Sequence, residues 1–482
     1  MNEKTHKYPP LLEVEDFSLS FRAYKKGLKE TTVEVVKRLS MTIHQGEIVA
    51  VIGASGSGKS LLVNAILGIL PDHAICKGQL KFKGKVLTKH LQEELRGKKI
   101  SMIPQSVNSL NPLMKVGKQV QEAIQAGDKA EIQHDIFKQV GLPTNAVNKY
   151  PFELSGGMAR KVLAATAMVS SAELIVADEP TPGLDPKSLE ETVRQIKELA
   201  LNGKGIMFIS HDLETALKIA DKVVVFQAGE TIETADANDF SGTGDNLKHP
   251  FTKALWNALP QNEFHPGYVK NLEGESFPSE SLEIKSISYK YERGPYVFKN
   301  LDLMIRPNEI VGIHGYSGSG KTTMAQVIAG YLKPETGSIQ IAGRKPERNG
   351  PHPVQLVWQH PEKAINPRWQ MRKVLKESNM TESALLDEFG IKQEWLTRWP
   401  SELSGGELQR FCIARALHEN TRYLIADEMT TMLDAVTQAR LWQLVLKLAK
   451  ERNIGVLAIS HDHSLLRRIS DRIINFQEIS HV

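Results

Sequence analysis

The sequence predicts an α/β fold that occurs twice in tandem, with a mainly parallel sheet in each copy. The chain has 482 residues, enough for two domains that each bury a core. Short runs rich in β-branched residues alternate with amphipathic stretches, as in parallel strands joined by helices. In the first copy we expect these strands over Ile48–Ile52, Leu174–Ala177, Ile206–Ile209 and Val223–Phe226.

An internal repeat supports the prediction of two domains. Lys59 and Lys321 are 262 residues apart in the first repeated motif, whereas Ser155 and Ser404 are 249 apart in the second. The first copy is therefore 13 residues longer between these motifs, across a region (Gln105 to Tyr150) whose helical pattern predicts a small helical subdomain. The segments that start at four positions return later in the same order: Ile48, Glu153, Leu174 and Ile209 correspond to Ile310, Glu402, Leu424 and Ile459.

The repeat sets the expected domain boundaries. We expect a first domain over residues 1–240 and a second domain over residues 282–482. Residues 241–281 between them contain a segment that starts at His249 and then a linker. The linker, from Pro260 to Ser281, is rich in Pro, Gly, Ser and Glu, which predicts exposed chain.

Composition and charge exclude several classes of protein. No apolar run approaches the roughly 20 residues that span a bilayer, and the N-terminus lacks the apolar region of a secretory signal. We therefore expect a cytosolic protein that contacts a membrane only through partner subunits. With 60 basic and 56 acidic residues the net charge is +4, so we expect no nucleic-acid partner. The two cysteines, Cys76 and Cys412, are too few for a zinc or iron–sulfur site and fit a reducing compartment.

Each copy contains a glycine-rich loop of the pattern G-x-x-x-x-G-K-[ST] between a predicted strand and a predicted helix. Glycines let successive backbone N–H groups point at phosphate groups, and the helix N-terminus adds a positive dipole end. A lysine neutralises the β- and γ-phosphates, and the last hydroxyl binds Mg²⁺. The pattern predicts two ATP sites made by Gly53, Ser55, Gly56, Gly58, Lys59, Ser60, Leu61, Gly315, Ser317, Gly318, Gly320, Lys321, Thr322 and Thr323.

Each copy also has an apolar run that ends in Asp-Glu. A strand that ends in aspartate places a carboxylate at the edge of the sheet beside the phosphate loop, where it can hold Mg²⁺. Asp178 and Asp427 have this position, and we expect them to bind the metal with Ser60 and Thr322. The following residues, Glu179 and Glu428, can polarise the attacking water as general bases.

The segments Leu154–Gly157 and Leu403–Gly406 both read LSGG, and with the motifs above they resemble the ATP-binding cassette family over nearly the whole chain. The resemblance implies two P-loop ATPase domains, each with a parallel sheet core, a helical subdomain and an antiparallel β subdomain. It also implies that each LSGG segment contacts the γ-phosphate of ATP held by the opposite copy. Lys59 would then share a site with Ser404, Gly405 and Gly406, and Lys321 would share one with Ser155, Gly156 and Gly157.

Further positions match the family. Gln105 and Gln359 resemble the lid glutamines that sense Mg²⁺ and contact the membrane subunits. His211 and His461 resemble the switch histidines on the γ-phosphate. Asp185 and Asp434 resemble the aspartates of the loop that couples the two sites. The resemblance also implies an aromatic ring that stacks on adenine, and the aligned candidates are Phe21 and Tyr291; the alternative is that these two rings are ordinary core aromatics.

The two copies also depart from each other. The first LSGG segment continues as Met-Ala-Arg-Lys, from Met158, whereas the second continues as Glu-Leu-Gln-Arg, so the first copy lacks the usual Gln-Arg pair. Pro180 in the first copy corresponds to Met429 in the second. Neither change removes a group expected to bind phosphate or Mg²⁺ or to act as the base. We therefore expect two hydrolytic sites.

Three segments resemble the importers of oligopeptides, dipeptides and nickel within this family. His249 to Pro260 reads HPFTKALWNALP and is similar to the HPYT segment that follows cassettes of that subfamily. Asn108 to Val120 and Lys363 to Leu375 are similar to its LNP stretch, which lies beside the surface for the membrane subunits. The resemblance implies an import motor that docks on two membrane permease subunits at the inner face of the cell membrane. An extracellular or periplasmic substrate-binding protein would deliver the cargo.

Other functions remain open from the sequence. The cargo could be a peptide, nickel or a metal chelate. The alternative to an importer is a soluble tandem ATPase that acts on ribosomes, although the linker lacks the long charged helix expected of that class. Repair ATPases of the same superfamily should carry zinc-binding cysteines, which this chain lacks.

Overall fold

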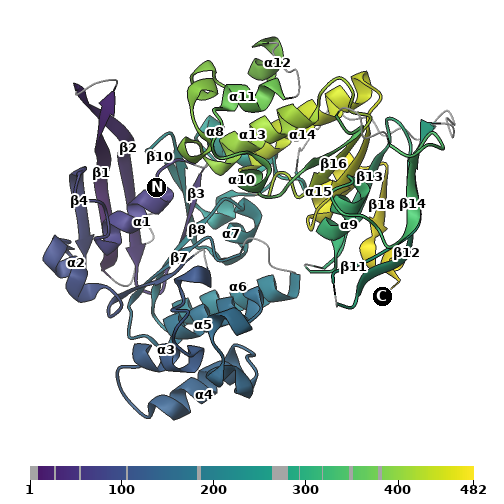
Figure 1. Ribbon diagram of the computed structural model, residues 1–482. Coiled ribbons are helices and arrows are strands. Elements are labelled where there is room, and N and C mark those ends of the chain that lie inside the picture. Colours follow the sequence, from purple (N-terminus) through teal and green to yellow (C-terminus); the bar gives the residue numbers. More distant parts are fainter. Residues whose placement is uncertain are drawn as a thin grey trace. The chain divides into compact units, whose positions relative to one another are not determined.

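The computed structural model describes residues 9–25, 29–53, 56–104, 107–181, 186–262, 280–292, 294–316, 318–346, 351–377, 383–431 and 433–481. The chain divides into two compact units, Met1–Trp256 and Asn257–Val482 (Figure 1). None of the described helices is long and apolar enough to span a membrane.

The described part of the first unit forms one mixed sheet in the strand order β5-β4-β1-β2-β10-β9-β3-β8-β7-β6. The strands from β9 to β6 are parallel, and β1 pairs with β2 and β4 in antiparallel fashion. The bounds are β1 Pro10–Lys25, β2 Lys29–His44, β3 Ile48–Gly53, β4 Ala74–Phe82, β5 Lys85–Val86, β6 Ile100–Ile103, β7 Leu174–Asp178, β8 Gly205–Ser210, β9 Lys222–Gln227 and β10 Glu230–Asp236. The four predicted strands and the antiparallel β subdomain are confirmed.

Three helices of this unit form a group of their own. Figure 1 shows α3, α4 and α5 together, apart from β1, β2 and β4. These helices have their own apolar core, which includes Val116, Phe137 and Val162, so the predicted helical subdomain is confirmed. The bounds are α1 Lys59–Leu67, α2 Lys89–Leu95, α3 Val116–Ala123, α4 Lys129–Gln139, α5 Gly156–Val169, α6 Pro186–Leu201, α7 Leu213–Ile219 and α8 Pro250–Asn257.

The second unit repeats this architecture with two separate sheets. A parallel sheet has the order β15-β16-β17-β13-β18, and an antiparallel sheet has the order β12-β11-β14. The strand bounds are β11 Leu282–Lys290, β12 Tyr296–Ile305, β13 Ile310–His314, β14 Thr336–Ile341, β15 Val354–Val357, β16 Tyr423–Asp427, β17 Gly455–Ile459 and β18 Arg472–Asn475. The helix bounds are α9 Lys321–Ile328, α10 Pro361–Ala364, α11 Met371–Lys376, α12 Ser383–Glu388, α13 Gly405–Ala416, α14 Ala435–Glu451, α15 His463–Ile469 and α16 Phe476–Ser480.

The two units end differently. In the first, the chain turns back after β9 as β10, and β10 joins the parallel strands to β2. In the second, the chain passes from β18 directly into the short helix α16. Among the described residues no strand joins the antiparallel strands of the second unit to its parallel strands, and the two sets form separate sheets.

The segment between the predicted domains has described residues at both ends. Glu233 on β10 accepts hydrogen bonds from the backbone N–H groups of Lys248 and His249, which fix the start of α8 in the first unit. Pro260 and Asn262 belong to the second unit, where Arg468 donates hydrogen bonds to both of their carbonyl oxygens. Residues 263–279, most of the predicted linker, lie outside the described residues.

Candidate nucleotide-binding sites

Each phosphate loop follows a buried parallel strand and leads into a helix. In the first unit β3 ends at Gly53 and α1 begins at Lys59, and the N-cap residue Gly58 has a left-handed backbone with φ 99°. In the second unit α9 begins at Lys321 after Gly320, whose φ is 106°. L side chains rarely adopt this conformation, so both positions require glycine. The predicted strand–loop–helix context is therefore present in both copies.

The lysine of each loop is buried and is held at the strand end. Lys59 Nζ donates to the carbonyl oxygen of Gly53 at 2.6 Å. Lys321 Nζ donates to the carbonyl oxygens of Gly315 and Tyr316, both at 2.7 Å. Burial lowers the pKa of Lys321, although the charges of Glu428 and Asp427 oppose this effect. The ammonium groups are thus confined to the mouth of the loop, where a phosphate would meet them.

Two further loop residues were not singled out from the sequence. The hydroxyl oxygens of Ser57 and Ser319 are buried and have no hydrogen-bond partner among the described residues. A buried hydroxyl without a partner costs free energy, and a phosphate oxygen at the loop would satisfy it. Their place in the fourth variable position of the motif is the sequence signal that could have identified them.

The predicted metal-binding aspartates lie at the ends of β7 and β16. Burial raises the pKa of Asp178 to about 6, and the neighbouring carboxylate of Glu179 adds to this effect, whereas Lys59 opposes it. Burial likewise raises the pKa of Asp427 to about 6, against a hydrogen bond from the hydroxyl of Thr322. This hydrogen bond joins the two predicted Mg²⁺ ligands of the second unit.

The predicted bases sit one residue further along, in a strained turn. Glu179 and Glu428 have left-handed backbones with φ 46° and φ 47°, which non-glycine residues adopt rarely and mainly at functional sites. His211 Nδ1 lies 3.3 Å from Glu179 Oε1, and His461 Nδ1 lies 3.5 Å from Glu428 Oε1. Each predicted base is therefore in contact with the predicted switch histidine of its own copy.

Both glutamates are ionised bases at neutral pH. Burial alone would raise the pKa of Glu179, but the hydrogen bond and charge of His211 and the charge of Lys59 lower it overall. The pKa of Glu428 is lowered in the same way, since His461 and Lys321 outweigh its burial. A carboxylate that remains deprotonated is able to accept a proton from water.

The predicted lid glutamine of the second unit contacts the predicted base directly. Gln359 Nε2 donates to Glu428 Oε2 at 2.7 Å. The corresponding Gln105 lies outside the described residues, as do Ser55, Ser317 and Asp185. Asp434 is described and caps α14, where its carboxylate accepts hydrogen bonds from the N–H and hydroxyl of Thr437.

Both LSGG segments begin a helix. Ser155 caps α5 and accepts a hydrogen bond from Met158 N, and Ser404 caps α13 and accepts one from Glu407 N, each at 3.3 Å. Only Ser404 is also tied back, because Glu407 Oε2 accepts from its backbone N–H at 2.8 Å. In the first copy Met158 replaces that glutamate. The two helix N-termini expose the predicted glycines Gly156, Gly157 and Gly405, whereas Gly406 is buried.

The two candidate adenine-stacking rings differ. Tyr291 is 50% exposed, and its hydroxyl lies 3.1 Å from the Thr323 hydroxyl in α9. Phe21 is half-buried and packs against the apolar core of the first unit, with its ring centroid 5.5 Å from that of His73. Leu61, at the position of Thr323, has no hydroxyl to offer.

The described residues fit ATP and Mg²⁺. The buried serine hydroxyls and the lysine ammonium groups suit phosphate oxygens. Hydroxyl and carboxylate oxygens are the ligands that Mg²⁺ prefers. Burial raises the pKa values of Asp178 and Asp427 to about 6, and a bound cation would stabilise their charged forms against this effect. In the second unit the loop, Asp427, Glu428, His461 and Gln359 form one connected group.

Comparison with known proteins agrees with this geometry. The sequence matches the family described as ABC transporter over residues 36–182 and 298–431, once in each copy. It is 31% identical to an uncharacterized ABC transporter ATP-binding protein, YejF, of Escherichia coli K12, over 96% of this chain and 93% of that protein.

Two further relatives have names that include a cargo. A peptidoglycan transport ATP-binding protein of Agrobacterium fabrum is 30% identical, over 96% of this chain and 90% of that protein. A glutathione import ATP-binding protein, GsiA, of Pectobacterium atrosepticum is 28% identical, over 96% of this chain and 84% of that protein.

Solved structures with the same fold have other names. The RNase-L inhibitor matches with a TM-score of 0.63 at 24% identity, over 96% of this chain and 87% of that chain. An archaeal ribosome recycling factor, in complex with a ribosomal stalk protein, matches with a TM-score of 0.62 at 22% identity, over 95% of this chain and 86% of that chain. At this identity the likeness shows the fold alone.

Proposed function

The chain belongs to the ABC transporter family, and from this premise we propose that it is the motor subunit of an importer for peptides or peptide-like molecules. ATP-binding proteins of this family are ATPases coupled to transport, and the chain is such an ATPase. The observation that carries the proposal is the set of loop lysine, Asp-Glu pair and predicted switch histidine in both copies. The relatives of the chain include a glutathione import ATP-binding protein and a peptidoglycan transport ATP-binding protein.

The cargo proposal follows the relatives. The named cargoes of similar proteins are glutathione and peptidoglycan, both of which contain peptide bonds, and this favours peptides over nickel or a metal chelate. The segment from His249 to Pro260 and the two LNP-like stretches support docking on two permease subunits. The chain would then work at the inner face of the cell membrane, with an extracellular or periplasmic binding protein that delivers the cargo.

We propose that the two ATP sites are shared between the copies, Lys59 with Ser404 and Lys321 with Ser155. Ser60 with Asp178, and Thr322 with Asp427, would hold Mg²⁺, which neutralises charge on the β- and γ-phosphates. The loop N–H groups, the lysines and the serine hydroxyls of Ser57 and Ser319 bind and orient the triphosphate.

Hydrolysis depends on the two glutamates. Glu179 or Glu428 accepts a proton from water as the water oxygen attacks the γ-phosphorus, the bond to ADP breaks and inorganic phosphate forms. His211 and His461 hold one carboxylate oxygen of each base, which orients the other oxygen. ATP binding would close the shared sites and turn the permeases, and phosphate release would reopen them.

The test combines hydrolysis with uptake. Cells that lack the chain are complemented with wild type, Glu179→Gln or Glu428→Gln, and the uptake of labelled dipeptide, oligopeptide, glutathione and Ni²⁺ is measured. We expect loss of uptake of a peptide-bonded cargo with either variant, and a fall of about 10² or more in hydrolysis at the altered site. Unchanged uptake of every peptide, together with sedimentation of the chain with ribosomes, would favour the ribosome-associated alternative.

A further inference from the structure

The segment that carries the lid glutamine of the second unit is held by the helix that follows the LSGG motif. Gln409 lies on α13, five residues after Ser404, and is only 3% exposed. Its Nε2 donates to the carbonyl oxygen of Trp358 at 3.1 Å. Trp358 comes directly before Gln359, so this hydrogen bond fixes the backbone from which the lid glutamine extends.

A second hydrogen bond continues from there to the base. Gln359 Nε2 donates to Glu428 Oε2 at 2.7 Å, and His461 Nδ1 lies 3.5 Å from the other carboxylate oxygen. The side chain of Gln409 is thus two hydrogen bonds and one peptide unit away from the predicted base. The ring of Trp358 also packs edge-on against Tyr331, with centroids 5.3 Å apart. Trp358 is therefore held both through its backbone carbonyl, by Gln409, and through its side chain, by Tyr331.

The orientation of Gln409 is not accidental. A carbonyl oxygen can only accept, so the NH₂ group of the amide must face Trp358, and this leaves Gln409 Oε1 buried without a partner among the described residues. An unsatisfied buried oxygen costs roughly 1–3 kcal/mol. Next to it, Arg410 Nη1 donates to the carbonyl oxygen of Phe389 at 2.8 Å, so α13 is tied to the helical region as well as to the lid segment.

The first unit has no such connection within its described part. Arg160 and Lys161 occupy the positions of Gln409 and Arg410, at the same 249-residue spacing as Ser155 and Ser404. Lys161 Nζ pairs with Glu191 of α6 at 2.9 Å, but Arg160 forms no hydrogen bond or ion pair with the residues described here.

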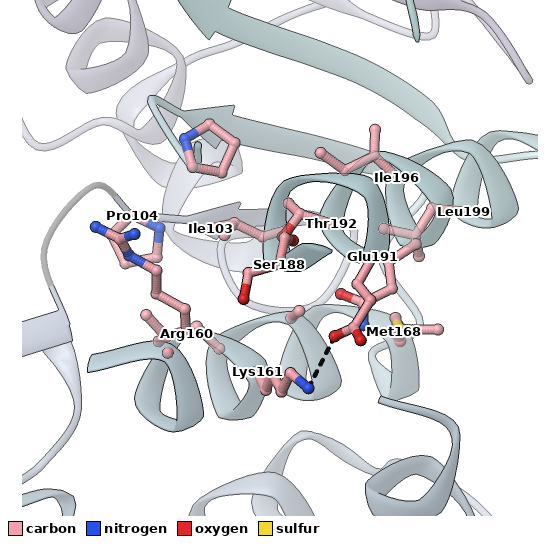
Figure 2. A pocket seen from close by; sticks show the side chains of 15 residues that line it. Ile103, Pro104, Arg160, Lys161, Met168, Ser188, Glu191, Thr192, Ile196 and Leu199 are labelled. Atoms are coloured by element: carbon pink, nitrogen blue, oxygen red, sulfur yellow. Dashed lines mark hydrogen bonds and ion pairs between the residues drawn. The ribbon is translucent and has the colours of Figure 1, made fainter. Parts of the chain in front are cut away.

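In the first unit a cavity is lined by Arg160 and Pro104, the residues that correspond to Gln409 and Trp358. It has a volume of about 40 Å³ and lies between α5 and α6, with Ile103, Pro104, Gly157 and Pro180 among its walls. Figure 2 shows Arg160 and Pro104 on the wall of this cavity, while Lys161 points at Glu191. A small cavity therefore lies between the helix after the first LSGG motif and the residues directly before Gln105.

We propose that Gln409 is a positioning residue for Glu428, which transmits a displacement of α13 to the base through Trp358 and Gln359. This rests on the proposed function, in which Ser404 at the start of α13 contacts the ATP bound to Lys59. Occupation of that site would then adjust the base of the other site. Within the described residues Arg160 makes no matching contact, so the proposal covers transmission from the Lys59 site to Glu428 alone, and kinetic effects need no symmetry between the two sites.

The test removes the donor and keeps the side-chain length. Gln409→Met is made in the Glu179→Gln background, where hydrolysis depends on Glu428. We expect kcat to fall about tenfold, the rate equivalent of one hydrogen bond, while KM for ATP stays within about twofold. Backbone hydrogen exchange over residues 355–360 should become faster in the nucleotide-free protein, since the anchor at Trp358 is lost.

The matched control is Arg160→Met in the Glu428→Gln background, for which we expect kcat within about twofold of its parent. The proposal is overturned if Gln409→Met leaves both kcat and exchange unchanged, or if kcat, KM and the melting temperature change together, as for general loss of packing. If Glu428→Gln alone keeps full hydrolysis, it is the proposed function that fails, and the exchange measurement still decides whether Gln409 holds the lid segment.

Discussion

In the first unit the side chain of His211 is 12% exposed beside Glu179, whereas in the second unit His461 is 41% exposed beside Glu428. The glutamates themselves are similarly buried and occupy the same turn after the same strand. The predicted base of the second unit, Glu428, also accepts a hydrogen bond from Gln359 on its other carboxylate oxygen. Two copies with the same motif residues therefore expose the histidine beside the predicted base to different extents.

The phosphate loops differ in how closely the rest of each unit surrounds them. A Cβ added to Gly53 would lie 2.3 Å from the carbonyl oxygen of Phe226, a backbone atom of the neighbouring strand β9. A Cβ added to Gly315 would meet nothing closer than 3.1 Å, and the nearest atoms belong to the side chains of Gln477 and Phe476 in α16. Strand β9 of the first unit thus leaves less space beside the loop than helix α16 of the second.

Replacement of Gly53 or Gly315 by alanine should change the affinity for ATP, and we expect the effect at Gly53 to be the largest of all those predicted. Gly53→Ala forces the loop away from β9, since a backbone carbonyl cannot move aside, and overpacking of this kind costs about 1–3 kcal/mol. We expect ATP affinity at the first site to fall roughly a hundredfold. Gly315→Ala should lower affinity at the second site by less than about tenfold, because side chains can shift. Titration with a fluorescent ATP analogue, with one site blocked in each case, measures both; equal losses would contradict the comparison.

Alanine substitution of the two adenine-stacking candidates should have effects on KM for ATP that differ by about tenfold. Tyr291 presents an exposed ring tethered to Thr323, so Tyr291→Ala should raise KM for ATP about tenfold, the equivalent of one stacked ring. Phe21→Ala should lower the melting temperature more than it raises KM, because this ring packs against the core. Tyr291→Phe keeps the ring and serves as the control, with a smaller rise in KM. A larger effect of Phe21→Ala on KM would reverse the assignment.

Replacement of the buried aspartates by asparagine should change the melting temperature by a few degrees. The pKa of Asp427 is raised to about 6, above its unfolded value, so ionisation destabilises the fold above that pH and the penalty is relieved as pH falls towards 4. Asp427→Asn removes the penalty while it abolishes hydrolysis. We expect the melting temperature of the nucleotide-free protein to rise by about 3–6 °C at pH 8 and not at pH 4.

Asp178→Asn gives the matching measurement in the first unit. Asp178 is 8% exposed against 2% for Asp427, and burial raises both pKa values to about 6, so we expect a gain of the same sign that is no larger. A gain that persists at pH 4 in either variant would show that charge burial is not its cause.

Sequence patterns were sufficient where chemistry depends on neighbours in the chain. The β-branched runs predicted β3, β7, β8 and β9, and the loop motif predicted the strand–loop–helix context of both lysines. The Asp-Glu pairs were placed correctly at strand ends because a strand and its next residue have fixed geometry. The contact between Glu428 and His461 was not stated from the sequence, but both residues were selected for the same site.

Contacts between distant segments were beyond such patterns. Gln409 and Trp358 are 51 residues apart, and the hydrogen bond between them depends on how α13 packs beside β15. The exposure of His461 and the orphan hydroxyls of Ser57 and Ser319 depend in the same way on tertiary packing. The roles of all the candidate site residues stay predictions, and Ser55, Gln105, Ser317 and Asp185 also lie outside the described part of the chain.

The smallest predicted effect concerns the space between α5 and α6. Ala164 lines the cavity of the first unit, whereas its counterpart Ile413 is fully buried in the core of the second. Ala164→Ile should therefore add apolar contact and raise the melting temperature by about 1–2 °C, corresponding to less than about 1 kcal/mol.

The control uses the same exchange three residues further along α5, at a position that does not line the cavity. Ala167 lies on the same helix, is 1% exposed and does not line the cavity, so Ala167→Ile should overpack the core and lower the melting temperature. Opposite signs for one substitution at two sites of one helix can only come from the space available around each site. Two changes of the same sign would mean that the first unit is packed as tightly as the second, and that Arg160 and the cavity do not distinguish the copies.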